Sequence, residues 1–378
     1  MELSRSQAVA LQWLEEGRRV IAATLIETLG SAPMAAGAEM LVDDTGRIEG
    51  SVTGGCVESA LVEEAMQVLA GGGARVKTYG ITDEQAVDVG LMCGGTVSLL
   101  VHEITAAAGD ALISVRDAVD AGRPAALATL VDGSGAGAKV AVVDDAVIGS
   151  LEGSDLLVRS VARDARGFLD EGRSAVRRYS AQGEVLGDDV RVHIQAFAAS
   201  PRMIIFGAID FSAALARLAV EVGYTVTICD ARSAFAQSPR FSSHADVVVA
   251  WPDRHLAGQT LGPRDAVLVF THDPKFDEPA LIAGLSSGAG YVGALGSRRT
   301  HADRLLRLRA AGLDAAQLGR ISAPCGLDIG ARTPSETAIS VIAEILALRA
   351  GRSGGPLRES EGPIHARPQI GESTRRAR

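Results

Sequence analysis

The feature that most restricts the fold of this chain is an internal repeat in its first half. The segment GRRVIAATLIE at 17–27 is matched by GRPAALATLVD at 122–132, about one hundred residues later. Each copy shows alternating apolar residues, typical of strands, around a helix-like segment with apolar residues every three or four positions. We therefore expect residues 1–105 and 106–198 to be two degenerate copies of one α+β unit that pack together.

The second half follows a different pattern. From Pro201 onward, short apolar strand-like runs alternate with helix-like stretches, as in MIIFG, TVTICD, DAVLVFTH and AGYVGALGS. This alternation predicts a Rossmann-like, doubly wound parallel sheet, whose ligand crevice lies at the carboxyl ends of its strands. The expected fold class is α/β, with domains at 1–198 and 199–350. The segment 351–378 is rich in Gly, Pro, Ser and Arg, and we expect a disordered tail there.

Composition excludes several classes of partner and site. A net charge of −9 argues against nucleic-acid binding, which needs clustered Lys and Arg. The chain has no apolar run of about 18 residues, so no membrane contact is expected. Without a signal-peptide pattern, its four cysteines are expected to be reduced thiols in the cytoplasm. They show no C-x₂-C spacing, so no metal site is expected.

Two cysteines of the first repeat stand beside glycine pairs, in GSVTGGCVES and GLMCGGT. Cys56 is expected in the first turn of a helix, where free N–H groups and the helix dipole stabilise a thiolate. Cys93 is expected at the end of a loop. The neighbouring glycines would let a ligand approach the backbone and would offer N–H donors to an anion; they are Gly54, Gly55, Gly94 and Gly95.

The second repeat lacks this chemistry. Asp155 occupies the position of Cys56, and GLMCGG has no counterpart. The fold therefore does not require either thiol, which favours a functional site over the alternative of two small core residues. The loop at 30–41 is also longer than its counterpart GSGAGAK. Whether it is functional or only a longer loop stays open.

The strand–helix–strand stretch after Pro201 resembles a dinucleotide fingerprint with one fault. Gly207 and Ala213 fill its outer positions, and Asp230 follows the second strand where the ribose would bind, but Ile209 replaces the middle glycine. That glycine lets the backbone approach the pyrophosphate. We therefore do not expect tight NAD(P) binding.

Two later stretches suggest ligand contacts. Gly296, Ser297, Arg298 and Arg299 lead from a strand into a helix and form a candidate anion cradle; a glycine turn followed by solvated arginines is the alternative. A long loop with Asp328 precedes the last helix, for which Ser335 is the expected N-cap. Cys325 lies in the same loop and could face the crevice. Cys229, inside a strand, is expected in the core, and His272 is a weak candidate at a strand end.

Taken together, GSAPMAAGAEML, GSVTGGCVESAL, GLMCGGT, GALGSRRT and GLDIGARTPSETAISVIAEI resemble the XdhC/CoxI family over nearly the whole chain apart from the tail. The resemblance implies an accessory protein, not an enzyme itself. Such a protein transiently binds the molybdenum cofactor (molybdopterin), helps a cysteine desulfurase to sulfurate it, and inserts it into an apo molybdenum hydroxylase of the xanthine dehydrogenase type. Cys56 and Cys93 would then act on the cofactor. The binding residues would be Gly54, Gly55, Gly94, Gly95, Gly207, Asp230, Gly296, Ser297, Arg298, Arg299 and Asp328.

The chain departs from the family pattern at one turn and at Cys325, which stands where members usually have an aliphatic residue. Family members usually show a G-A-G-H-type turn where this chain has Gly207-Ala208-Ile209-Asp210. The alternatives to a cofactor chaperone are an NAD(P)-dependent oxidoreductase and an interacting component of the hydroxylase that holds no cofactor. We also expect a homo-oligomer, such as a dimer.

Overall fold

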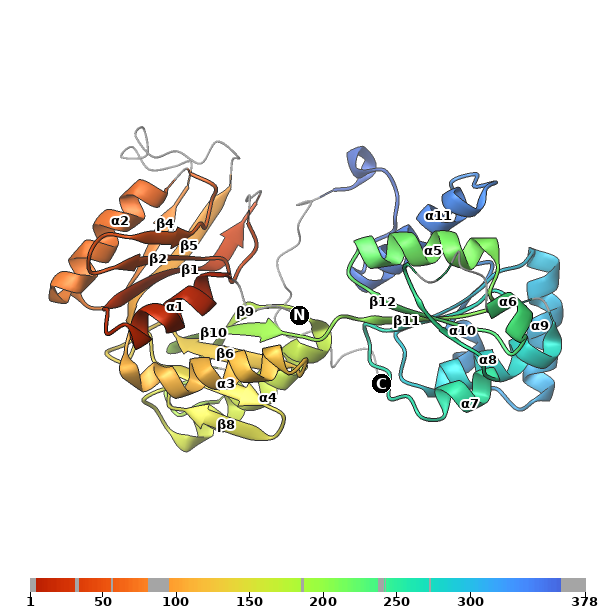
Figure 1. Ribbon diagram of the computed structural model, residues 1–378, viewed down its shortest axis with the longest axis horizontal. Coiled ribbons are helices and arrows are strands. Elements are labelled where there is room, and N and C mark those ends of the chain that lie inside the picture. The colour runs from red at the N-terminus through yellow and green to blue at the C-terminus, as the bar shows by residue number, and fades with distance from the viewer. Residues whose placement is uncertain are drawn as a thin grey trace. The chain divides into compact units, whose positions relative to one another are not determined.

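The computed structural model describes residues 5–30, 34–55, 57–80, 95–184, 187–236, 241, 243–271 and 273–361. They form two units, one in the chain up to Ala199 and one from Ser200 to Ser360 (Figure 1). Among the helices of the described residues, none is both long enough and apolar enough to cross a membrane.

The first repeat is a five-stranded antiparallel sheet with the strand order β3-β2-β1-β5-β4. Its elements are α1 (Arg5–Glu15), β1 (Val20–Leu29), β2 (Glu39–Asp43), β3 (Ile48–Gly50), α2 (Glu58–Gln67), β4 (Arg75–Tyr79) and β5 (Thr96–Ile104). A π-helical turn (Val68–Gly72) follows α2, and the run of glycines there ends the helix.

The second repeat has the same elements in the same order, and its sheet runs β8-β7-β6-β10-β9. The elements are α3 (Gly109–Asp120), β6 (Ala125–Leu130), β7 (Lys139–Val143), β8 (Ala146–Gly149), α4 (Asp155–Glu171), β9 (Ala175–Tyr179) and β10 (Val190–Phe197). The register is also shared, since Val20 pairs with Asp43 and the equivalent Ala125 pairs with Val143. The predicted duplication is confirmed.

Alternation along the strands divides each sheet into two apolar faces. One face of the first sheet packs on α2 through residues such as Ile21, Leu61 and Leu99, and one face of the second sheet packs on α4 in the same way. The remaining faces share a core with α1 and α3, which includes Trp13 and Leu112. The two repeats therefore form one unit with a common interior (Figure 1).

Part of that shared interior is polar. Glu39 and Lys139 occupy equivalent positions in the two repeats and both are buried. The Thr24 hydroxyl donates to Glu39 Oε1 (2.9 Å), and Lys139 Nζ donates to the Thr129 hydroxyl (3.0 Å). Burial raises the pKa of Glu39 and lowers that of Lys139 to about 8, although the opposite charges act against both shifts.

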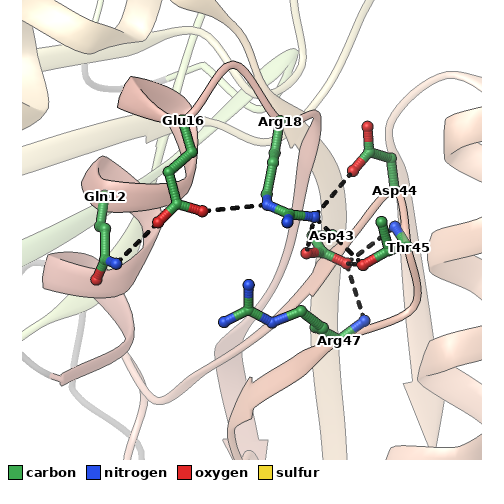
Figure 2. A network of polar contacts seen from close by, with 7 residues as sticks. All are labelled: Gln12, Glu16, Arg18, Asp43, Asp44, Thr45 and Arg47. Carbon is green, nitrogen blue, oxygen red and sulfur yellow. Dashed lines mark hydrogen bonds and ion pairs between the residues drawn. The ribbon is translucent and has the colours of Figure 1, made fainter.

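At one end of the first sheet, a polar network holds the β2–β3 turn. Arg18 Nη1 donates to Asp43 Oδ2 (2.9 Å), while Asp43 Oδ1 accepts from the N–H groups of Thr45 (2.9 Å) and Arg47 (2.8 Å) (Figure 2). Burial acts to raise the pKa of Asp43, but a hydrogen bond from the Thr45 hydroxyl (2.7 Å) together with the bonds above outweighs it and lowers the pKa. The network closes this end of the sheet, where β1 begins.

The second unit is a six-stranded sheet in the order β13-β12-β11-β14-β15-β16, and every paired strand is parallel. This confirms the Rossmann-like prediction. Its strands are β11 (Arg202–Phe206), β12 (Thr225–Cys229), β13 (Asp246–Val248), β14 (Ala266–Val269), β15 (Tyr291–Ala294) and β16 (Ile321–Ser322).

Helices cover both faces of this parallel sheet. They are α5 (Asp210–Glu221), α6 (Ser233–Ala236), α7 (Pro252–Leu256), α8 (Pro274–Ser286), α9 (Arg298–Ala310), α10 (Ala315–Gly319) and α11 (Pro334–Arg349). One core joins α5 and α11 to the sheet, and a second core joins α7, α8, α9 and α10 to its other face. Loops follow the carboxyl ends of the strands.

Two predicted helix starts are each wrong by two residues. The N-cap of α11 is Thr333 rather than Ser335, because the Thr333 hydroxyl accepts from the Glu336 N–H group in a capping box. The helix α2 begins at Glu58, two residues beyond Cys56. In the predicted tail, Leu357–Glu359 forms one 3₁₀ turn, and 362–378 lie outside the described residues.

Candidate functional site

Three loops that carry the predicted motifs leave the first sheet at one end. The last residue of β1, Leu29, pairs with Thr96 at the start of β5, and the last residue of β4, Tyr79, pairs with Val97. Gly50, which ends β3, lies at the same end beside the start of β2. The chain segments that follow Leu29, Gly50 and Tyr79 therefore leave the sheet toward the same end, opposite to the Asp43 network. The first and the last begin on either side of β5, whereas Gly50 lies on the other edge of the sheet, at the level of Ala23.

The predicted residues on these loops are described only in part. Cys56, Cys93 and Gly94 lie outside the described residues, and Gly95 is buried directly before β5. Gly54 and Gly55 are exposed and have φ values of +79° and +119°, a conformation that favours glycine. A Cβ atom on either would meet nothing within 4 Å. The backbone here is thus open to approach from solvent.

The carboxylate of Glu58 organises the loop before α2. Its oxygens accept hydrogen bonds from the hydroxyl groups of Ser51 (2.6 Å) and Thr53 (2.8 Å). They also accept from five backbone N–H groups, those of Val52 (3.2 Å), Thr53 (2.9 Å), Gly54 (3.1 Å), Gly55 (2.9 Å) and Val57 (3.1 Å). Both neighbours of position 56 are therefore anchored to one side chain.

These contacts change the expected role of the glycines. Burial acts to raise the pKa of Glu58, but the hydrogen bonds from Ser51 and Thr53 outweigh it and lower the pKa to about 2. The N–H groups of Gly54 and Gly55, predicted to bind an anionic ligand, donate instead to this internal carboxylate. The helix α2 starts late for the same reason, because residues 51–55 and Val57 wrap around the Glu58 carboxylate.

The second repeat does not have this arrangement. Leu157 occupies the position equivalent to Glu58, and its N–H group donates to the side chain of Ser154, an ordinary N-cap (3.1 Å). The carboxylate-centred loop is thus specific to the repeat that carries the two glycine-flanked cysteines.

In the second unit, Asp230 lies at the carboxyl end of β12, as predicted, but its carboxylate is occupied. Arg232 donates to both of its oxygens (3.0 and 2.8 Å), and the N–H group of Ala208 donates to Oδ2 (2.9 Å). Burial acts to raise the pKa of Asp230, and these contacts outweigh it and lower the pKa. In a dinucleotide-binding site, the Asp230 carboxylate would contact the ribose and the Ala208 N–H group would contact the phosphates. Here these two groups bind each other. A Cβ on Gly207 would lie 3.1 Å from the Phe270 carbonyl carbon, so glycine is required there for packing.

The predicted anion cradle forms the start of α9. Ser297 is the N-cap, and its hydroxyl accepts from the Thr300 N–H group (3.1 Å). Arg298 and Arg299 are exposed in the first turn, and Asp328 is exposed in the loop between β16 and α11. These residues, with Gly207 and Asp230, belong to the carboxyl edge of the parallel sheet, whereas Gly54, Gly55 and Gly95 belong to the first unit.

The two described cysteines are core residues. Burial raises the pKa of Cys229 and of Cys325 to about 12 in each case. Cys229 is in the core, as the sequence predicted. Cys325 does not face the crevice, because its side chain packs against the α5 and α11 core. His272 lies outside the described residues.

Comparison with known proteins agrees with this architecture. A model of the XdhC and CoxI family matches residues 13–80 and 118–180, one segment in each repeat. A model of the XdhC Rossmann domain matches residues 203–345 of the second unit. The chain belongs to the XdhC and CoxI family. The resemblance found in the sequence motifs is thereby confirmed.

Similar proteins span nearly the whole chain. A probable xanthine dehydrogenase subunit of Bacillus subtilis is 28% identical over 344 residues, which cover 89% of this chain and 95% of the relative. The molybdenum cofactor insertion chaperone PaoD of Escherichia coli is 26% identical over 340 residues, covering 90% and 86% of the two chains. A crystal structure described as a xanthine dehydrogenase from Bacillus halodurans covers 92% of this chain and 96% of its own, with 25% identity and a TM-score of 0.61.

Sequence reasoning missed three residues that organise this XdhC and CoxI chain. Glu58 could have been found from the repeat. The second copy has Leu157 at the equivalent position, so the fold does not require an acidic residue there and a role specific to the first copy is indicated. Lys139 could have been singled out as a charged residue within an apolar strand, at the position equivalent to Glu39. The equivalence does not show that the two side chains share an interior. Arg304 lies within α9, and no motif or spacing in the sequence around it distinguishes it from the other arginines of that helix.

Proposed function

We propose that this protein is an accessory chaperone that binds the molybdenum cofactor as cargo, assists its sulfuration, and inserts it into an apo molybdenum hydroxylase of the xanthine dehydrogenase type. Cys56 and Cys93 handle the sulfur and molybdenum end of the cargo, and Gly54, Gly55, Gly94 and Gly95 let it approach the backbone. The partners are the apo-hydroxylase and a cysteine desulfurase, and the working form is a homo-oligomer in the cytoplasm.

One observation carries this proposal. The three loops with the glycine and cysteine motifs start from the same end of the first sheet, and the same end of the second sheet has neither the motifs nor the Glu58 carboxylate. A relative named as a molybdenum cofactor insertion chaperone supports the accessory role. The cofactor-binding role of Gly207, Asp230, Gly296, Ser297, Arg298, Arg299 and Asp328 is part of the same proposal.

The Glu58 carboxylate explains how the loop could act on such cargo. A carboxylate that accepts five backbone N–H groups keeps residues 51–55 and Val57 in one conformation, so a ligand does not have to order them on binding. A fixed negative charge near position 56 does not stabilise a thiolate. A metal ligand or exchange partner must nevertheless be a thiolate. We therefore propose that the Cys56 thiol releases its proton to solvent only as its sulfur bonds to the cargo, where it serves as a soft ligand or exchange partner rather than as a free, strongly acidic nucleophile.

The test is cofactor retention by the full chain. Protein purified from a host that makes the molybdenum cofactor should contain molybdenum, measured by elemental analysis, and pterin, measured by fluorescence after oxidation. Cys56→Ala and Cys93→Ala should each lose most of both. The matched control is Cys229→Ala, which removes a buried thiol from the other unit and should retain both.

The possible results separate the function from its site. Wild-type protein without molybdenum or pterin would contradict the chaperone proposal. If Cys56→Ala and Cys93→Ala both retain molybdenum and pterin as the wild type does, the assignment of these two cysteines is contradicted but the chaperone proposal is not. Transfer is tested by adding loaded protein to the apo-hydroxylase and measuring the activity that appears, with the desulfurase present or omitted.

A further inference from the structure

Two glycine-bearing loops of this protein direct N–H groups at a carboxylate of the protein itself. In the loop before α2, the N–H groups of Gly54 and Gly55 donate to the Glu58 carboxylate. In the loop after β11, the Ala208 N–H group donates to the Asp230 carboxylate. The third such loop, at 296–299, is different. Across the part of the chain that the structure describes, no carboxylate accepts a hydrogen bond from these four residues.

The start of α9 is also unusually positive. The N–H groups of Arg298 and Arg299 belong to the first helical turn, where no acceptor exists within the helix. This turn contains no acidic residue, whereas α5 and α8 carry Asp210 and Asp277 in theirs. Cationic side chains at the positive end of a helix raise the electrostatic free energy, and a bound anion removes that cost.

An independent observation comes from Arg304, which lies further along α9 and is fully buried. Its Nη2 donates to Asp277 Oδ2 (2.9 Å) and to the Leu295 carbonyl oxygen (3.1 Å). Its Nε and Nη1 atoms are buried and have no hydrogen-bond partner among the described residues. Buried guanidinium donors are rarely left unpaired, so these two nitrogens are available to an acceptor that a ligand brings.

The free guanidinium nitrogen lies near the glycine of the same loop. A Cβ atom on Gly296 would lie 3.9 Å from Arg304 Nη1 and 3.4 Å from the Thr300 side chain. Gly296 has a φ of +142°. The absent side chain therefore leaves space between the loop and the buried guanidinium, at the carboxyl edge of the sheet where ligands of open α/β folds bind.

We propose that the start of α9, together with Arg304, binds a phosphate group. A phosphomonoester carries up to two negative charges and three acceptor oxygens, which match the N–H groups of the first turn and the three guanidinium groups of Arg298, Arg299 and Arg304. The phosphate of the pterin cargo is one source, an assignment that rests on the proposed function. A nucleotide is the other source.

The test measures binding of inorganic phosphate to the full chain by titration calorimetry, with chloride at matched ionic strength as the reference. Arg299→Gln should weaken phosphate binding about tenfold, because one charge-assisted contact is lost. The matched control is Arg309→Gln, which removes the same charge from an exposed position on α9 near its other end and should change binding less than about twofold.

Arg304→Lys tests the buried guanidinium, since it keeps the charge but removes the unpaired Nε and Nη1 donors. It should weaken phosphate binding at least as much as Arg299→Gln. If this variant does not fold, Arg299→Gln against Arg309→Gln decides alone. Phosphate binding by Arg299→Gln at wild-type strength, or no saturable phosphate binding by the wild type, would overturn the proposal.

Two further arms identify the source of the phosphate. Loss of cofactor retention in Arg299→Gln shows that the cargo supplies it, whereas competition by ADP with unchanged retention shows a nucleotide. Cys56→Ala separates this inference from the proposed function, because it should bind inorganic phosphate as the wild type does even where it loses the cargo.

Discussion

Replacing Glu58 by Gln should loosen the loop before α2 and destabilise the first unit. The lowering of the Glu58 pKa from 4.5 to about 2 corresponds to at most about 3.4 kcal/mol at ~1.36 kcal/mol per pKa unit. Because the side chain is partly exposed, solvent screening reduces this, and we expect a loss of about 1.5–2 kcal/mol at pH 7. The glutamine amide also places a donor against backbone donors of the loop.

The effect should depend on pH with a defined sign. The folded pKa of Glu58 lies below the unfolded value, so its stabilisation is present above about pH 5 and is lost as the pH falls toward 2. The difference between wild type and Glu58→Gln should therefore shrink by roughly half or more between pH 5 and pH 3.

The assay uses the two tryptophans, one in each unit. Trp13 is buried in α1 and Trp251 precedes α7. In a Trp251→Phe background, urea unfolding followed by fluorescence reports the first unit alone. Glu63→Gln, which removes an exposed charge from the same helix, should change stability by less than about 0.5 kcal/mol. A Glu58→Gln effect that equals this control, or that stays constant from pH 7 to pH 3, would refute the reasoning.

Three further expectations concern buried polar groups and thiols. Lys139→Met should destabilise the first unit by about 3 kcal/mol in urea unfolding because Glu39 loses its compensating charge, and adding Glu39→Gln should restore part of the loss; additive losses would contradict the coupling. The wild type should show no saturable NADH binding in the micromolar range by fluorescence titration, since Asp230 is occupied, and a micromolar dissociation constant would refute this. Cys229 and Cys325 should not react with a thiol reagent at pH 8 until the protein unfolds, because burial raises both pKa values to about 12; rapid reaction of either in the folded protein, followed by peptide mapping, would show that it is accessible.

Much of the fold could be predicted because it depends on local periodicity. The strand at Val20–Leu29 and the hairpin around Gly46 follow from alternating apolar residues and a turn signal. The helix starts were less accurate. At α11, the hydroxyl of Thr333 rather than that of Ser335 reaches the helix N–H groups, a choice that depends on a reciprocal bond with Glu336.

The candidate site could be predicted as a set of motifs but not as an electrostatic arrangement. Sequence spacing identified Gly54 and Gly55 as N–H donors and Asp230 as a ribose-binding carboxylate. The structure pairs these donors with Glu58, and Asp230 with Arg232. A pattern identifies which groups can bind an anion, but the folded backbone decides whether a side chain of the protein reaches them first.

By itself, the sequence determined the duplication, the change to a parallel sheet after Pro201 and the family, because these rest on repeated patterns along the chain. Only the tertiary structure decided which charges meet. Glu39 and Lys139 stand far apart in the sequence and share an interior because two sheets pack together, and Arg304 keeps unpaired donors because α9 buries it beside the carboxyl edge of the parallel sheet. Such contacts depend on distances between elements, which no spacing along the chain encodes.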